Sequence, residues 1–185
     1  AEHARLLQPL RHHTSASSDY VKTYQIVRGL QTISITNANK GDYFKTTPDP
    51  AEELTNYILT ENISISGDVY LNLTDNSEFD GGNFTITMSD NFGGLFATNA
   101  TTGNNSIIRN LNITGGTILA NGGSVMRSSQ SNFEIINCEY DTAISNNGCG
   151  GIAGNTSSNF TITNCTFSNN ISGVSCGGIV GSSSG

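Results

Sequence analysis

An internal repeat of 27 residues constrains the fold of this 185-residue chain more than any other feature. Residues 131–154 read SNFEIINCEYDTAISNNGCGGIAG, and residues 158–181 read SNFTITNCTFSNNISGVSCGGIVG. The two segments align without a gap and are identical at 13 of 24 positions, which is far beyond chance. Weaker copies precede them, including FTITMSDNFGGLF at residues 84–96. Such a period is typical of proteins built from stacked supersecondary units.

Each repeat has the pattern of short strands separated by turns. In Phe160-Thr161-Ile162-Thr163 the apolar residues alternate with threonines, as in a half-buried strand. Clusters of Asn, Gly and Ser interrupt these strands, as turns require. One unit cannot bury its own apolar face, whereas stacked copies can. We therefore expect an all-β chain, a parallel, right-handed β-helix of about five coils over residues 62–185, with an open C-terminal end.

The period also predicts which side chains stack in successive coils. Ile108, Ile135 and Ile162 should stack inside, and the paired glycines at 150–151 and 177–178 should form tight corners with positive φ. Asparagines spaced by one period predict a side-chain ladder at one corner, with amide hydrogen bonds between coils. The members of this predicted ladder are Asn110, Asn137 and Asn164.

The four cysteines follow the same period. Cys138 stacks over Cys165 and Cys149 over Cys176, and adjacent coils place such Cα atoms within the roughly 4.4–6.8 Å that a disulfide spans. The alternatives are pairing within a coil, Cys138 with Cys149 and Cys165 with Cys176, or four buried thiols acting as small apolar residues. An even number at regular spacing favours disulfides and an oxidising compartment.

The first 45 residues predict a basic arm. Residues 1–45 carry six cations and three acidic residues, a net charge of +3, whereas residues 46–185 have a net charge of −10. Opposite charges can steer one copy onto the next. We interpret residues 1–45 as an N-terminal arm with one or two strands, at 24–28 and 31–36, that contacts another subunit. A loosely attached tail is the alternative.

Residues 46–61 predict a short capping helix at the start of the stack. Pro50 suits the first helical turn, and Glu52 and Glu53 favour its positive end. The other end lacks a comparable signal, because the sequence stops at residues 181–185 where the period predicts a further coil. An open sheet edge invites strand addition. Two explanations, which do not exclude each other, are that the chain is a fragment of a longer protein and that its open end accepts the arm of the next copy, which would give a filament.

The repeats resemble a known family. The strings NCTFSNNISG and CGGIVG at the C-terminal end, and NCEYDTAIS and CGGIAG one period earlier, are similar to GLUG-type repeats of adhesin-like cell-surface β-helix proteins. The preceding segments AEELTNYI, VYLNL, FDGGNFTI, GGLF and IIRNLNITGG extend the resemblance over residues 51–181. It implies an extracellular surface or stalk role and supplies no catalytic residues. Cys149 and Cys176 depart from the pattern, which more often has an apolar residue there.

Ten Asn-x-Ser/Thr sequons occur, about twice the number that composition predicts. In a eukaryotic secretory pathway the outward-facing ones can carry N-glycans, whereas in a bacterial protein they would have no meaning. Asn164 is the least suited, because it belongs to the predicted ladder. The glycosylation candidates are Asn62, Asn72, Asn83, Asn99, Asn104, Asn112, Asn155, Asn159 and Asn170.

Composition and motifs argue against several other functions. A net charge of −7 disfavours nucleic acid binding, and no apolar run approaches the roughly 18 residues of a membrane span. Residues 46–185 contain no His or Lys, and Arg109 is expected to pair with Glu134 on the solvated face. No triad, phosphate loop or zinc spacing is present, and His3, His12 and His13 are expected to be solvated. We expect no enzymatic activity, metal or cofactor.

Together these patterns predict an extracellular structural β-helix glycoprotein, a head-to-tail subunit of a filament, appendage or surface coat. Its main partners are then copies of itself. One alternative is an adhesin stalk or ligand-binding module of a longer surface protein, which contacts glycans or a host surface. Another is a fragment of a polysaccharide-active enzyme, which would rest on analogy with other β-helices alone.

Overall fold

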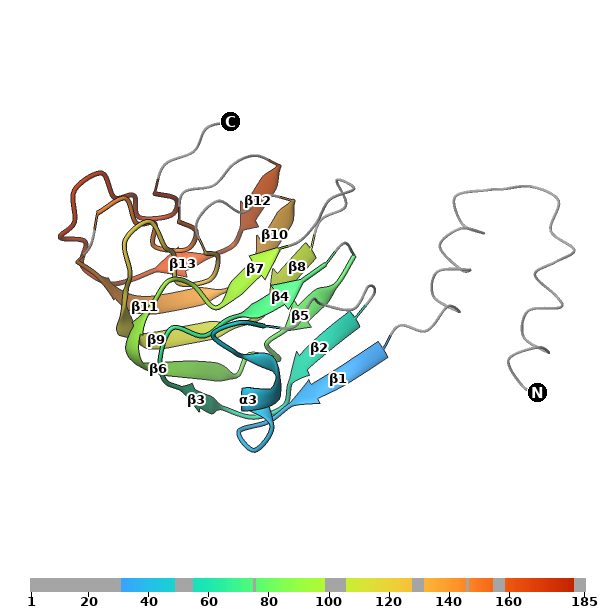
Figure 1. Cartoon of the computed structure of the whole chain (residues 1–185). Coiled ribbons are helices and arrows are strands. Elements are labelled where there is room, and N and C mark those ends of the chain that lie inside the picture. Colours follow the sequence, from blue (N-terminus) through green and yellow to red (C-terminus); the bar gives the residue numbers. More distant parts are fainter. Residues whose placement is uncertain are drawn as a thin grey trace, which may run out of the picture. The chain divides into compact units, whose positions relative to one another are not determined.

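The computed structural model describes residues 31–48, 55–74, 76–98, 106–127, 132–145, 147–154 and 159–181. These residues form an all-β solenoid of parallel sheets, which confirms the predicted fold class (Figure 1). The chain divides into two compact units after Gln31, and the solenoid belongs to the second. The strand expected at 24–28, the three histidines and three glycosylation candidates lie outside the described residues; these candidates are Asn99, Asn104 and Asn155.

Three sheets run along the solenoid. The main sheet has the order β1-β2-β5-β8-β10-β12, and its strands are Gln31–Ile35, Thr55–Leu59, Glu78–Asp80, Ser106–Arg109, Phe133–Ile136 and Phe160–Thr163. The second sheet contains β3, β6, β9, β11 and β13, which are Ile63–Ile65, Thr85–Phe92, Asn112–Ile118, Glu139–Ile144 and Thr166–Phe167. The third pairs β4 (Leu71–Leu73) with β7 (Phe96–Thr98), and isolated bridges continue it through Met126, Ala153 and Val180.

The coils follow the period read from the sequence. Successive coils begin at β2, β5, β8, β10 and β12, so the chain completes about four full turns before the last coil, close to the five expected. Ile108 pairs with Ile135, and Ile135 pairs with Ile162. The stacked isoleucines are therefore confirmed. Ile108 and Ile135 are fully buried, whereas Ile162 in the last coil is only half-buried.

The expected capping helix is wrong for the residues that the structure describes. Thr55–Leu59 form strand β2, in which alternate side chains are buried. The strand pattern of TNYIL, with Tyr57 and Leu59 facing the core, outweighs the helix signals that precede it. In the described ranges the one helix is α3 (Lys40–Tyr43). This helix is too short and too polar to cross a membrane.

The segment after β1 closes the N-terminal end of the core. Ile35 is fully buried, and α3 leads into Phe44, whose ring packs edge-on against Phe79 and Phe96 at centroid distances of 6.3 and 6.1 Å. The described residues between Thr32 and Lys45 therefore belong to the solenoid. The boundary of the predicted arm at residue 45 is too late, because β1 supplies the first strand of the main sheet.

The paired glycines do not have the positive φ expected of them. Three of the four are required instead because other atoms approach closely: a Cβ would overlap Ala153 O at Gly150, Gly178 O and the Phe167 ring at Gly151, and Val180 O at Gly177. A Cβ on Gly178 would make only an ordinary contact with Ile171. Positive φ occurs at the ladder asparagines, with values of 53°, 53° and 51° at Asn110, Asn137 and Asn164. The corners of the coils are thus formed by asparagine in the left-handed region.

Candidate functional site

The predicted asparagine ladder is present at the corner between the main and second sheets. Asn110, Asn137 and Asn164 each follow a main-sheet strand directly, and the next strand of the second sheet begins two residues later. Asparagine tolerates left-handed backbone better than most residues, because its short polar side chain can hydrogen-bond locally. One residue type therefore supplies both the turn and the coil-to-coil contact.

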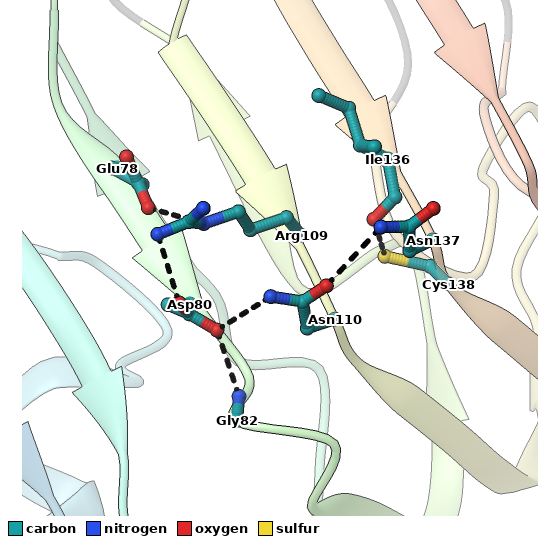
Figure 2. Close-up of polar contacts among 8 residues, drawn as sticks. All are labelled: Glu78, Asp80, Gly82, Arg109, Asn110, Ile136, Asn137 and Cys138. Atoms are coloured by element: carbon teal, nitrogen blue, oxygen red, sulfur yellow. Dashed lines mark hydrogen bonds and ion pairs between the residues drawn. The ribbon is translucent and has the colours of Figure 1, made fainter.

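The ladder amides form a chain with one direction. Asn164 Nδ2 donates to Asn137 Oδ1 at 3.3 Å, and Asn137 Nδ2 donates to Asn110 Oδ1 at 3.4 Å. Asn110 Nδ2 donates in turn to Asp80 Oδ1 at 3.1 Å (Figure 2). Each Nδ2 points toward the N-terminal coil and each Oδ1 toward the C-terminal coil. The ladder lies on the outside of the solenoid, because Asn137 and Asn164 are exposed.

A charged cluster ends the ladder on its N-terminal side. Arg109 binds Glu78 through Nε at 2.5 Å and Asp80 through Nη2 at 3.0 Å, and Gly82 N donates to Asp80 at 2.9 Å (Figure 2). The expected pair of Arg109 with Glu134 is wrong. Glu78 and Glu134 both lie beside Ile107, in β5 and β10. Arg109 turns to β5, because its direct neighbour there is Asp80, whereas its direct neighbour in β10 is the apolar Ile136.

A polar groove of about 310 Å³ runs beside the ladder. Its lining is made of amides, one hydroxyl and one carboxylate, from Asn83, Asn112, Asn137, Glu139, Asn164 and Thr166. These groups can hydrogen-bond to hydroxyls, but the lining has no aromatic ring for a sugar to stack on and no second carboxylate for acid–base catalysis.

A second, shorter ladder was missed in the sequence. Asn159 Nδ2 donates to Asn132 Oδ1 at 3.2 Å, and both residues have positive φ, 56° and 58°. They precede the stacked rings of Phe133 and Phe160, whose centroids are 5.4 Å apart. The same 27-residue spacing could have revealed this pair, since both repeats contain Ser-Asn-Phe at this place.

Arg127 forms a further contact that sequence reasoning missed. Its guanidinium binds Asp68 through two hydrogen bonds of 2.7 and 3.0 Å and lies 4.3 Å from the centre of the Tyr70 ring. The hydrogen bond from Arg127 lowers the pKa of Asp68, and a hydrogen bond from Gly93 N adds to this against the effect of burial. Asp68 and Arg127 are 59 residues apart, so only the fold brings them together.

The cysteines stack in the predicted pairs, and all four are thiols in this structure. Cys149 N donates to Cys176 Sγ at 3.4 Å. A hydrogen bond from Cys138 lowers the pKa of Cys165 to about 7, and the same contact and burial raise the pKa of Cys138. The fully buried Tyr140 hydroxyl has no hydrogen-bond partner among the described residues. Disulfide pairing stays a prediction.

The described glycosylation candidates differ in exposure. Asn62, Asn83, Asn159 and Asn170 are exposed, whereas Asn72 and Asn112 are half-buried. The Nδ2 atoms of Asn112 and Asn159 already donate hydrogen bonds, to Asn83 O and Asn132 Oδ1. N-glycans attach at this nitrogen, so Asn62, Asn83 and Asn170 are the better acceptors.

Within the described ranges, no group of three or more His, Cys, Asp or Glu residues is arranged to hold a metal ion. No family model, curated protein or solved structure matches this chain. The resemblance to GLUG-type repeats therefore stays a prediction.

Proposed function

We propose that this chain is an extracellular structural glycoprotein whose copies stack head to tail into a filament, appendage or surface coat. One observation carries the proposal: the two outer strands of the main sheet, β1 and β12, lie at opposite ends of the solenoid (Figure 1). Unpaired strand edges promote association with another chain. A head-to-tail contact between two different ends gives an open filament when the rotation between copies does not close a ring, as in stacking along the solenoid axis.

The last described coil supports the same function. Ile171 and Ile179 are 41% and 42% exposed, whereas their equivalents one coil earlier, Ile144 and Ile152, are buried. Val174 is 69% exposed, and its equivalent Asn147 is exposed as well. Covering these side chains with a further layer would remove apolar surface from water, which is favourable. Stacked coils also provide the rigidity that a structural subunit needs.

Sedimentation velocity of the full chain over a range of concentrations, with negative-stain microscopy of the same samples, tests this function. We expect species that grow with concentration and are linear in the images. If the chain stays monomeric at every concentration up to about 100 μM, the proposal is contradicted, because a contact with a micromolar dissociation constant would be formed at that concentration.

Glycosylation is tested separately, on material from a eukaryotic secretory host. We expect peptide N-glycosidase to lower the mass, with Asn62, Asn83 and Asn170 as occupied sites, because their side chains are exposed and their Nδ2 atoms donate no hydrogen bond within the described residues. Asn159 serves as the internal comparison, since it is equally exposed but its Nδ2 is engaged. An unchanged mass would remove the glycoprotein part of the proposal.

A ligand-binding module is the second candidate, and the polar groove is the observation that favours it. Neutral amides and one carboxylate suit the hydroxyls of a glycan. Glu139→Gln keeps the shape of the groove and removes its charge, so it should weaken glycan binding measured by calorimetry. Asp141→Asn is the matched control, since Asp141 lies two residues away on the same strand but outside the groove.

A further inference from the structure

Two thiols from consecutive coils lie side by side in the core. The strands before and after them pair in register, so Cys138 and Cys165 are direct neighbours, and Thr166 N donates to Cys138 O at 2.9 Å. Adjacent strands lie about 4.8 Å apart, inside the roughly 4.4–6.8 Å over which a disulfide joins two Cα atoms. The two sulfur atoms can therefore bond without a shift of the strands.

The two thiols differ in their access to solvent. Cys138 is fully buried, whereas Cys165 is half-buried and belongs to the last described coil. In the part of the chain that the structure describes, no further strand covers this coil, since β12 and β13 are the outer strands of their sheets. A small reagent therefore reaches Cys165 before Cys138, and a reaction with an external oxidant begins at Cys165.

The contact between the thiols also makes Cys165 the better nucleophile. The Cys138 thiol donates a hydrogen bond to the Cys165 sulfur, which lowers the pKa of Cys165 to about 7 although burial acts in the opposite direction. The same contact and burial raise the pKa of Cys138. Because the thiolate is the reactive form of cysteine, the more accessible of the two thiols is also the more reactive one.

A buried tyrosine hydroxyl lies close to this pair. Among the described residues, Tyr140 alone has a buried side-chain oxygen or nitrogen without a hydrogen-bond partner. Burial raises the pKa of Tyr140 well above its ordinary value, and negative charge on Cys138 or Cys165 raises it further, so the hydroxyl is near both sulfur atoms. Its neighbours in the flanking coils, Ile113 and Phe167, have no hydroxyl. An unpartnered buried hydroxyl costs free energy, and a hydrogen bond to a charged sulfur would offset that cost.

The other two cysteines have the same spacing in a different environment. Cys149 is buried and Cys176 is half-buried, and Cys149 N donates to Cys176 Sγ at 3.4 Å. They belong to a separate, smaller cluster of apolar side chains, which contains no tyrosine among the described residues. This pair is therefore an internal control for the reactivity of the first.

We propose that Cys165 and Cys138 form a redox-active site that reduces hydroperoxides. With hydrogen peroxide, the Cys165 thiolate attacks one oxygen, so that an S–O bond forms and the O–O bond breaks. The sulfur is oxidised to a sulfenic acid, and the other oxygen leaves as hydroxide, which takes up a proton to give water. The inference is independent of the proposed head-to-tail function.

Cys138 completes the reaction. Its sulfur loses a proton and attacks the Cys165 sulfur, an S–S bond forms, and the sulfenic hydroxyl leaves with that proton as a second water. One peroxide is thus reduced to two waters as two thiols are oxidised to a disulfide. Tyr140 is a positioning residue, whose hydroxyl donates to the Cys138 sulfur as that thiol ionises.

Peptide mapping of the fully reduced, full-length chain after addition of hydrogen peroxide tests the site. Parallel samples contain dimedone, which traps sulfenic acids. We expect the Cys138–Cys165 disulfide to form at least about tenfold faster than the Cys149–Cys176 disulfide, because the first pair has a thiolate-forming sulfur within reach of solvent. One peroxide should be consumed per chain in this phase.

Three variants separate the roles of the residues. Cys138→Ser keeps a donor beside Cys165 but cannot form the disulfide, so dimedone should label Cys165. Cys165→Ser removes the reacting thiol, so Cys138 should stay reduced and unlabelled. Tyr140→Phe keeps the ring and should slow disulfide formation about tenfold, the effect of one hydrogen bond to a charged group, without lowering the melting temperature. Tyr57→Phe, which removes a tyrosine hydroxyl from another coil, is its control and should leave the rate unchanged.

The results either support or overturn the site. A sulfenic acid on Cys165 that is followed by a disulfide with Cys138 supports it. A sulfenic acid on Cys138, faster oxidation of Cys149 and Cys176, or a disulfide between the Cys165 residues of two chains would overturn it. An unchanged rate in Tyr140→Phe would overturn the role of the hydroxyl. None of these readouts requires association of the chain, so a failure of the head-to-tail function is measured separately.

Discussion

At the scale of single residues, the corner asparagines have two roles: they adopt the positive φ of the turn, and they form the hydrogen bonds between coils. The period placed Asn110, Asn137 and Asn164 in one column, so the ladder could be predicted. Their positive φ could not, because the spacing of a repeat says which residues stack but not how the backbone turns. The paired glycines were expected to have that role instead, and the structure shows that Gly150, Gly151 and Gly177 are needed because other backbone atoms approach them closely.

The two roles of the ladder can be measured apart at Asn137. Asn137→Gly removes two amide hydrogen bonds but keeps a residue that adopts positive φ freely. Asn137→Ala removes the same bonds and adds backbone strain, so it should lower the free energy of unfolding by about 1 kcal/mol more in urea titrations. If Asn137→Gly and Asn137→Ala lower the free energy of unfolding equally, the left-handed backbone at this corner does not contribute to stability.

The contact between Cys138 and Cys165 predicts a difference in reactivity with pH. The thiolate is the nucleophile, and the pKa of Cys165 is lowered to about 7, so its alkylation by iodoacetamide should rise through a midpoint near that pH. Cys138 should stay unreactive, because its pKa is raised. Cys138→Ala removes the hydrogen bond and should move the Cys165 midpoint upward. A midpoint that is the same in wild type and variant would contradict the contact, and peptide mapping by mass spectrometry measures both.

At the scale of elements, the repeats were more predictable than the segment before them. Residues 131–181 contain two copies of one repeat with the same alternating pattern. The positions and the register of their strands therefore follow from aligning the two copies. The first coil has no close copy, and there local helix signals around Pro50 competed with the strand pattern of β2. The strand forms because the sheet gives Tyr57 and Leu59 a place in the core, a tertiary effect that local signals do not contain.

The ion pair of Arg127 with Asp68 connects separate coils, and its contribution to the stability of the fold should depend on pH. The folded pKa of Asp68 lies below its ordinary value of 3.8, so the pair stabilises the fold above that value and loses its effect as pH falls through the lower folded pKa. Asp68→Asn should therefore cost about 1 kcal/mol at pH 7 and less below pH ~3.8. Asp141→Asn, at an exposed carboxylate without an ion pair among the described residues, should show no such change. A cost for Asp68→Asn that persists at the lowest pH would contradict the assignment.

Consecutive coils provide a matched pair of core substitutions. Ile135 is fully buried between β8 and β12, whereas its repeat partner Ile162 is half-buried in the outer strand. In the monomer, Ile135→Ala should cost about 2–5 kcal/mol and Ile162→Ala clearly less. Urea titration at low concentration measures both. Equal costs would mean that the last coil is already covered in the monomer.

At the scale of the whole molecule, the two ends of the solenoid differ. Phe44, Lys45 and Asn37 cover most of the N-terminal end, whereas the last described coil exposes Ile171, Val174 and Ile179. The sequence predicted the stacked coils through its repeat. It did not reveal that β1 belongs to the main sheet, since an isolated alternating strand in a basic segment has no repeat partner to fix its place.

The axial rise of the assembled chain tests the head-to-tail account most directly. Within the part of the chain that the structure describes, the main sheet has six strands, and a sheet that continues from β12 to the next β1 adds about 4.8 Å per strand. Helical reconstruction from electron cryomicroscopy should therefore give a rise of about 29 Å per subunit, with unbroken strand spacing across the junction. Side-by-side packing, or a rise that leaves a gap between β12 and β1, would contradict the account.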